Sequence, residues 1–135
     1  MNNTRFATAV HIMTVLASKA DQWLSSDYIA GSIQINAAMV RKEIAVLLKA
    51  GLVESRKGKE GGCRLAKNPE KIYLSEIFKA VNANAILGKK NKKTNPKCPI
   101  GKQINQHLDD LFDEIDANVL EMLSSKSVAD FLRKF

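Results

Sequence analysis

Hydrophobic side chains recur at helical spacing in three successive segments of the first fifty residues. This periodicity predicts amphipathic helices over residues 4–19, 27–33 and 37–50. Ser25 or Ser26 stands where it can cap the second helix. Because only a short polar turn joins the second and third helices, the pattern predicts a helix-turn-helix.

The third of these helices has two chemically different faces. Asn36 can cap its first turn, and Gly51 follows its last. Its buried face is expected to consist of the hydrophobic residues Val40, Ile44, Leu47 and Leu48. The opposite face carries small and basic residues, namely Ala38, Arg41, Lys42, Ala45 and Lys49. Small residues would let this face approach the floor of the DNA major groove, where arginine and lysine reach bases and phosphates; an ordinary solvated helix face is the alternative.

A β-hairpin with a basic turn is predicted next. Short strands are expected over 52–55 and 63–66, and Gly58, Gly61 and Gly62 permit a tight turn between them. The basic side chains of this turn, which would line a phosphate track or enter the minor groove, are Arg56, Lys57 and Lys59. The turn lacks the Gly-Lys-Ser/Thr ending of a nucleotide-hydrolase phosphate loop, which excludes that function. A helix-turn-helix followed by such a hairpin is the order of a winged helix.

The second half of the chain contains further short elements and a basic loop. A short strand at 72–74 and a helix at 76–82, capped by Ser75, are expected after the hairpin. Residues 83–99 are dominated by lysine and asparagine, which predicts a flexible basic loop. A last short helix is expected after Ser127, where Ser-Val-Ala-Asp resembles a capping box.

A long helix, which Pro99 is suited to open, is predicted over 100–123. Its apolar seam repeats in steps of four and three residues, with one polar member: Ile104, Leu108, Leu111, Ile115, Asn118 and Met122. A seam of this length favours pairing with a second copy of the chain, and so a homodimer; packing on its own domain is the alternative. The predicted fold class is mainly α with a small β-hairpin wing. Its parts are a winged helix-turn-helix domain at 1–82, the flexible basic loop at 83–99, and a dimerisation helix with a short C-terminal helix at 100–135.

Charge is distributed unevenly along the chain. The net charge of +7 favours a polyanionic partner. The cations cluster in the hairpin turn and over 89–102, whereas acidic residues gather over 109–121. Two cysteines among 135 residues exclude a disulfide scaffold. No stretch is apolar enough for a signal peptide or a membrane span, so a cytoplasmic protein without a membrane partner is expected.

Together these elements resemble the Rrf2 family of bacterial winged-helix transcriptional regulators, over nearly the whole chain. The most specific matches are Ile-Asn-Ala-Ala-Met-Val-Arg-Lys at 35–42, Leu-Leu-Lys-Ala-Gly-Leu-Val at 47–53, Gly58, Gly61, Gly62, Leu65 and residues 72–81. The resemblance implies a homodimer held by the long helix, with base contacts from Ala38, Arg41 and Lys42 and a minor-groove contact from Lys57. Cluster-binding members have Glu and Gln in place of Arg41 and Lys42, so a different operator is expected.

The cysteines depart from the pattern of the cluster-binding members. Those members carry three closely spaced cysteines before the long helix, and this chain has only Cys98, at the position of the last. One thiolate cannot hold an iron–sulfur cluster, so no cofactor is expected. Cys98 lies beside Lys97 and near the start of the long helix, where the helix dipole and cations lower the pKa of a thiol.

We therefore hypothesise a redox switch at Cys98. Its reaction partner would be an oxidant or a low-molecular-weight thiol, Cys63, or Cys98 of the partner subunit. The alternative is a structural cysteine in a regulator that senses a small ligand.

The sequence as a whole indicates a sequence-specific DNA-binding transcriptional regulator, and a repressor in particular. The alternatives are a winged-helix protein-interaction module and a regulator that responds to a small ligand. An enzyme such as a thiol peroxidase is excluded, because neither His11 nor His107 stands near Cys98 in a triad-like pattern. The sequence also lacks a paired-carboxylate, metal or nucleotide motif.

Overall fold

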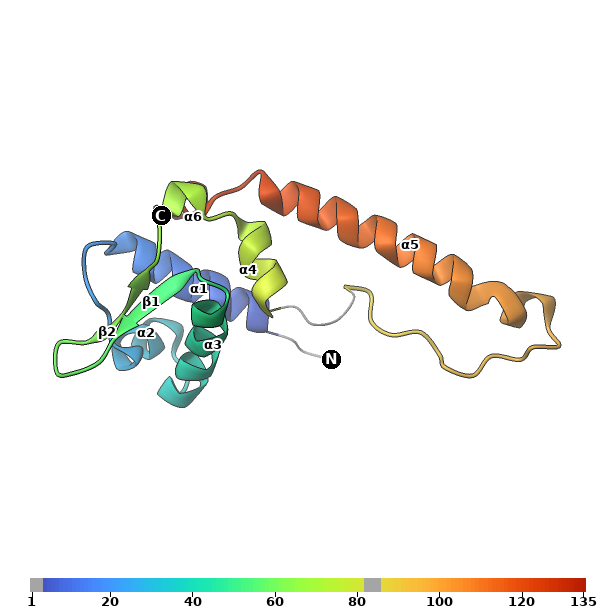
Figure 1. The fold of residues 1–135 in the computed structure, drawn as a ribbon, viewed down its shortest axis with the longest axis horizontal. Coiled ribbons are helices and arrows are strands. Elements are labelled where there is room, and N and C mark those ends of the chain that lie inside the picture. Colours follow the sequence, from blue (N-terminus) through green and yellow to red (C-terminus); the bar gives the residue numbers. More distant parts are fainter. Residues whose placement is uncertain (1–3, 82–85) are drawn as a thin grey trace.

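The computed structural model describes residues 4–81 and 86–135, which form two parts. The winged-helix body (residues 4–81 and 125–135) is a cluster of short elements, and the arm (residues 86–124) is one long helix with the loop before it (Figure 1). The elements of the body are α1 (Arg5–Ser18), α2 (Ser26–Ile33), α3 (Ala37–Lys49), β1 (Val53–Arg56), β2 (Gly62–Leu65), a 3-10 helix (Pro69–Lys71), α4 (Leu74–Val81) and α6 (Val128–Leu132). The arm contains α5 (Pro99–Ser124). The predicted fold class, mainly helical with a two-stranded wing and a long C-terminal helix, is confirmed.

Local signals in the sequence determine where the helices of the helix-turn-helix begin. The Ser25 hydroxyl accepts a hydrogen bond from the Tyr28 N–H at 3.1 Å, and the Asn36 Oδ1 accepts one from the Ala38 N–H at 2.7 Å. Each side chain thus caps the helix that follows it, as predicted. Gly51, just after α3, has a φ of 78°, a left-handed conformation that favours glycine at a helix end.

The buried face of α3 differs from the prediction at one position. Leu48 is 43% exposed, while the other three predicted residues are buried. Glu43 takes the fourth place, because positions 40, 43, 44 and 47 follow one helix face, whereas position 48 is turned away from it. The Glu43 carboxylate is compensated from α1, where the Arg5 Nε lies 3.1 Å from its Oε1.

A backbone bridge ties the wing to the helices. β1 and β2 pair antiparallel, each displaced by one residue from its predicted range. Leu24, in the segment between α1 and α2, forms a β-bridge with Cys63 in which each N–H donates to the other's carbonyl at 2.9 Å. A Cβ on Gly62 would come within 2.3 Å of the Leu24 carbonyl oxygen, so this close approach requires glycine.

The segment after the wing corrects two predictions. Residues 72–74 add no strand to the sheet, because only Tyr73 forms a bridge, to Ser127, and α4 already begins at Leu74. Ser75 is therefore buried inside the first turn of α4 rather than capping it. Glu76 reaches back instead, and its Oε2 accepts a hydrogen bond from the Tyr73 N–H at 2.8 Å. The predicted end of this helix at residue 82 lies outside the described residues.

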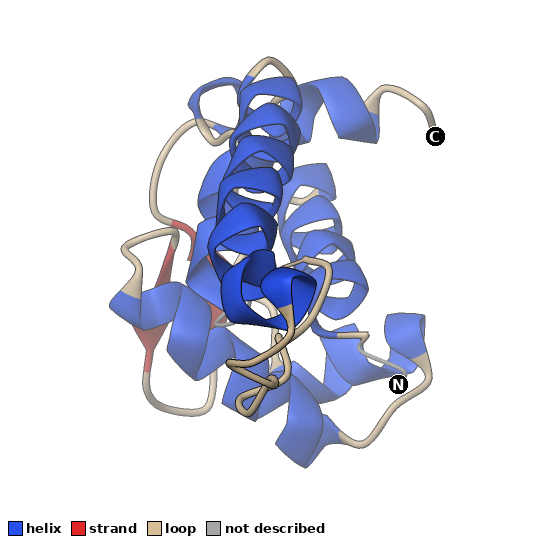
Figure 2. Ribbon diagram, turned by 90° about the vertical axis from the view of Figure 1, so that its right-hand side faces the viewer, coloured by secondary structure: helices blue, strands red, loops and turns tan. Residues whose placement is uncertain are grey.

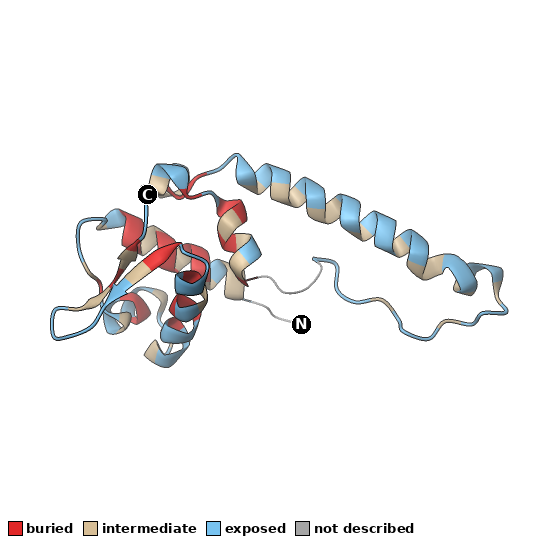
Figure 3. Cartoon of the chain, in the orientation of Figure 1, coloured by how far each residue is buried: buried red, intermediate tan, exposed pale blue. Residues whose placement is uncertain are grey.

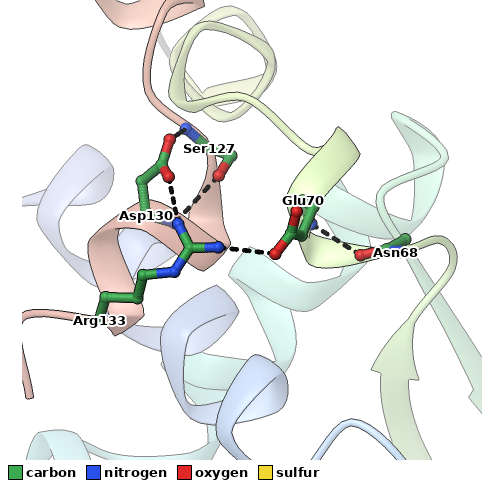
Figure 4. A network of polar contacts seen from close by, with 5 residues as sticks. All are labelled: Asn68, Glu70, Ser127, Asp130 and Arg133. Atoms are coloured by element: carbon green, nitrogen blue, oxygen red, sulfur yellow. Dashed lines mark hydrogen bonds and ion pairs between the residues drawn. The ribbon is translucent and has the colours of Figure 1, made fainter.

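The short C-terminal helix packs on the body. Its predicted capping box is present, since the Asp130 N–H donates to the Ser127 Oγ and the Ser127 N–H donates to the Asp130 Oδ2, both at 3.0 Å. Figure 4 shows this network continuing to the 3-10 helix, where Arg133 pairs with Glu70 at 2.6 Å. Val128 is buried in the core, and α6 contacts α1. Within the predicted unit 100–135, α6 thus packs on the body, whereas α5 forms the arm.

The arm extends away from the body, and α5 has no buried residue, whereas the body has a continuous core (Figures 1 and 3). Residues 86–98 contain no helix or strand. Figure 2, seen from the far end of the arm, shows this loop folded against the first turns of α5. There the Asn105 Nδ2 donates to the Asn91 carbonyl at 2.8 Å, and Lys90 pairs with Asp109. The flexibility expected of 83–99 stays a prediction, and residues 83–85 lie outside the described ranges.

Candidate nucleic-acid interface

The polar face of α3 is exposed over the length of the helix. All five residues predicted for this face are exposed: Ala38, Arg41, Lys42, Ala45 and Lys49. The buried side of α3 packs on α1, α2 and α4, which fixes the helix with its basic side outward. The two alanines keep the surface low between the longer side chains. A helix whose exposed face combines small residues with basic side chains is able to enter a major groove.

The wing and α3 are fixed relative to each other by the core of the body. β1 follows α3 after Gly51 and packs against it, while β2 packs on α1. In Figure 1 the start of α3 and the turn of the wing both lie along the lower edge of the body. One molecule therefore presents both basic surfaces at once.

The basic residues of the wing fall into two groups. Lys57 and Lys59 lie in the turn and are exposed. Arg56 is also exposed, but its Nη2 donates a hydrogen bond to the Glu60 carbonyl at 2.8 Å, which braces the turn. Arg64, on β2, forms an ion pair with Glu54 of β1, with 2.6 Å between Nε and Oε1. The lysines thus lie in the turn itself, whereas Arg56 ends β1 and Arg64 lies within β2.

Trp23, in the segment between α1 and α2, lies against both arginines. The Cζ atoms of Arg56 and Arg64 are 4.7 Å and 4.2 Å from the centroid of the Trp23 ring, distances typical of cation–π contacts. No local pattern predicts this contact, because it depends on the bridge between Leu24 and β2. The one signal in the sequence is a large aromatic residue in the short segment between the first two helices.

The two cysteines have opposite surroundings. Cys98 is the N-cap residue of α5, and its Sγ accepts a hydrogen bond from the Gly101 N–H at 3.4 Å. The backbone N–H groups of Gly101 and Ile100 lower the pKa of the Cys98 thiol below its ordinary value. Cys63 is buried on β2, and this burial raises its pKa to about 11. The helix terminus thus favours the thiolate at Cys98, whereas the core disfavours it at Cys63.

The predicted dimerisation seam is partly exposed along α5. Leu111 is 47% and Met122 is 64% exposed, and Asn118 is exposed as well. Ile104, Leu108 and Ile115 are half-buried. Three of the six seam residues are thus exposed to solvent.

The described residues do not fit a metal ion or an iron–sulfur cluster. Within 4–81 and 86–135, no group of three or more His, Cys, Asp or Glu side chains is arranged to hold a metal. The two cysteines of the chain lie on different elements, one in the wing and one at the start of α5. A cluster that needs four ligands cannot be built from these two thiols alone. In the same part of the chain, no helix is long and apolar enough to cross a membrane.

Known proteins resemble this chain along its whole length. A model of the Rrf2 family, described as iron-dependent transcriptional regulator, matches residues 2–134. YwnA of Bacillus subtilis (strain 168), described as a candidate HTH-type transcriptional regulator, is 37% identical over 132 residues, which cover 98% of this chain and 97% of YwnA. These relatives are regulators and not enzymes.

Solved structures share the fold. The crystal structure of a candidate DNA-binding protein is 36% identical, with a TM-score of 0.77 over 95% of this chain and 98% of that one. CymR, the global cysteine regulator of B. subtilis, is 23% identical, with a TM-score of 0.74 over 100% of this chain and 98% of CymR, a likeness of fold alone. The sequence motifs, the winged-helix body and these matches agree, and the chain belongs to the Rrf2 family of transcriptional regulators.

Proposed function

We propose that the chain binds a double-stranded DNA operator as a homodimer and represses transcription from it. The observation that carries this proposal is the exposed basic face of α3 beside a basic wing on one body. Arg41 is able to donate two hydrogen bonds to a guanine edge, and Lys42 and Lys49 reach bases or phosphates. Lys57 and Lys59 would follow the phosphate backbone into the minor groove.

A binding titration tests the DNA interface. Fluorescence anisotropy is measured with a duplex selected by the protein from a random pool, and with unselected DNA of equal length. We expect tight binding to the selected duplex that weakens steeply as salt rises. Arg41→Ala should relax the sequence preference, whereas Lys49→Ala should weaken binding to both duplexes. Lys79→Ala, which removes an exposed cation from α4, is the control. Equal affinity for both duplexes, or an affinity for DNA that does not change with salt, would contradict the proposal. Either result would favour the alternative, a protein-interaction module.

The partly exposed seam of α5 supports the homodimer. A 26-residue helix without a buried residue leaves apolar surface that a second copy of the same helix would cover. Leu111→Glu, at the centre of the seam, is expected to convert the dimer into a monomer in sedimentation velocity. Gln106→Glu adds the same charge to an exposed position outside the seam and should leave the dimer intact. Two half-sites about one helical turn apart, or a multiple of it, are expected in the operator.

Oxidation of Cys98 is the signal that we propose for release from the operator. The Cys98 thiolate attacks the terminal oxygen of a hydroperoxide, the O–O bond breaks, and a sulfenic acid forms. The leaving hydroxide or alkoxide takes a proton from the solvent and departs as water or an alcohol. A second thiol then displaces the hydroxyl as water and closes a disulfide. Since Cys98 caps the helix that carries the dimer seam, such a change would alter the start of α5 and the spacing of the two α3 helices.

Repeating the DNA titration after mild peroxide treatment tests the switch. We expect loss of operator binding in the wild type and in Cys63→Ser, recovery with a reductant, and no response in Cys98→Ser. If Cys98→Ser responds like the wild type, the switch does not act through this thiol.

An apolar pocket supports a small ligand as the second candidate signal. It has a volume of about 760 Å³, lies between α1 and α6, and is lined by residues that include Phe6, Val10, His11, Leu74, Phe131 and Phe135. This volume is within the range of small-molecule sites. This signal would be favoured if oxidation leaves DNA binding unchanged and an apolar compound releases the DNA. In Ala7→Trp, whose new ring would fill the pocket, the compound should then no longer release the DNA.

A further inference from the structure

Backbone register explains why Trp23 faces the arginines of the wing. The bridge that Leu24 makes to β2 is antiparallel, so Trp23 stands opposite Arg64 on the same face of the sheet. Arg56 reaches the ring across Gly62, which is its partner on β2 and has no side chain to intervene. All three side chains therefore share the face of the hairpin that points away from the core.

The two arginines on this ring are held differently. The charge of Arg64 is compensated by Glu54 in a contact of 2.6 Å. Arg56 is exposed, and its Nη2 donates to the Glu60 carbonyl, a neutral acceptor, at 2.8 Å. An indole against one plane and a carbonyl at one N–H orient the Arg56 guanidinium without neutralising it. An arginine that is already oriented loses less conformational entropy on binding a phosphate than a lysine of the turn loses.

We propose that Trp23 is a positioning residue for DNA binding by the wing: its indole holds the Arg56 guanidinium in the orientation that contacts a backbone phosphate. This rests on the proposed function, since it requires the wing to contact DNA. It adds a residue from outside α3 and the hairpin to the determinants of operator affinity. It also distinguishes Arg56, which is oriented before binding, from Lys59 at the tip of the turn.

A double-mutant cycle measures the coupling between ring and guanidinium. Operator affinity is determined at one salt concentration for the wild type, Trp23→Ala, Arg56→Ala and the double variant. We expect each single change to weaken binding about fivefold, and the double variant to bind no more weakly than about fivefold, because either change removes the same oriented contact. Trp23→Ala combined with Lys59→Ala is the control pair, and its effects should multiply. Trp23→Phe keeps an aromatic face and should retain most of the affinity.

Fluorescence keeps the test independent of any misfolding of Trp23→Ala. The chain has a single tryptophan, so emission reports on Trp23 alone. Operator addition is expected to change the emission in the wild type and in Lys59→Ala, and to change it much less in Arg56→Ala.

The outcomes separate this inference from the proposed function. If the effects of Trp23→Ala and Arg56→Ala multiply, or if Arg56→Ala leaves the fluorescence response intact, while the wild type binds its selected duplex, the positioning role is overturned and DNA binding stands. If the wild type shows no salt-sensitive preference for the selected duplex, the proposed function fails and this inference fails with it.

Discussion

The winged-helix body and the arm carry equally regular hydrophobic patterns but differ in burial. α3, in the body, buries four of its 13 residues, whereas α5, in the arm, buries none of its 26. Periodicity predicts a helix in both places, because spacing along the chain is enough to define one apolar face. Burial also requires a second surface, which the body supplies to itself. The difference supports the proposed homodimer, in which a second copy of this chain would cover the apolar seam of the arm.

Stability is where the body and the arm should differ most. Leu47 of α3 is fully buried, so Leu47→Ala should lower the free energy of unfolding by about 2–5 kcal/mol at any protein concentration. Leu111→Ala removes the same atoms from a side chain that is 47% exposed, and should cost less than about 1 kcal/mol in dilute solution. Its cost should grow with protein concentration as the dimer forms. Urea denaturation at two concentrations measures both, and equal, concentration-independent losses would mean that the arm is covered within its own chain.

The second-largest difference between the body and the arm should be the reactivity of their cysteine thiols. The pKa of Cys63 in the body is raised to about 11 by burial, whereas that of Cys98 at the start of α5 lies below the ordinary 9.0 because N–H groups at the helix terminus favour the thiolate. At neutral pH the thiolate fractions should therefore differ more than about a hundredfold. Alkylation by iodoacetamide, followed by mass spectrometry in Cys63→Ser and Cys98→Ser, gives each rate. A Cys98 rate whose pH profile matches that of a free thiol would remove the basis of the proposed switch.

Features of the fold that depend on near neighbours could be predicted from the sequence. Asn36 caps α3 and Ser127 closes a capping box, because each side chain bonds to the backbone two or three residues ahead. Gly51 marks a left-handed helix end, and Cys98 lies at an N-cap because Pro99 opens α5. In these cases sequence spacing and spatial distance are nearly the same quantity.

Features that depend on distant partners could not be predicted. The burial of a charged residue, Glu43, on the core face of α3 depends on Arg5 of α1, whose Nε lies 3.1 Å from the carboxylate. The contact of Trp23 with the wing requires a bridge between segments that are far apart in sequence. For the candidate site, helical spacing alone identified the exposed basic face of α3, but not the brace that holds Arg56.

Substitutions in the segment that joins the arm to the body should lower the free energy of unfolding by a smaller amount. Ser127 follows α5 closely and caps α6, which docks on the body. Ser127→Ala removes one acceptor of the capping box and should cost about 1 kcal/mol in urea denaturation. Ser125→Ala is the matched control, since the Ser125 hydroxyl bonds only locally, to the Met122 carbonyl. If both variants lose the same stability, the capping box does not anchor α6 to the body.

The smallest expected effect is the loss of stability at acid pH that the capping box of α6 causes. Hydrogen bonds from the backbone N–H and the hydroxyl of Ser127, with help from Arg133, hold the pKa of Asp130 below its ordinary 3.8. A carboxyl whose pKa is lower in the folded state contributes stability above its unfolded pKa and loses it as the pH falls through the folded value. The unfolding midpoint of the wild type should therefore fall more steeply below about pH 4 than that of Asp130→Asn. Asp113→Asn, which removes a carboxylate from the arm instead, is the control. If it changes the pH dependence of the unfolding midpoint as much as Asp130→Asn does, the loss of charge and not the capping box causes the effect.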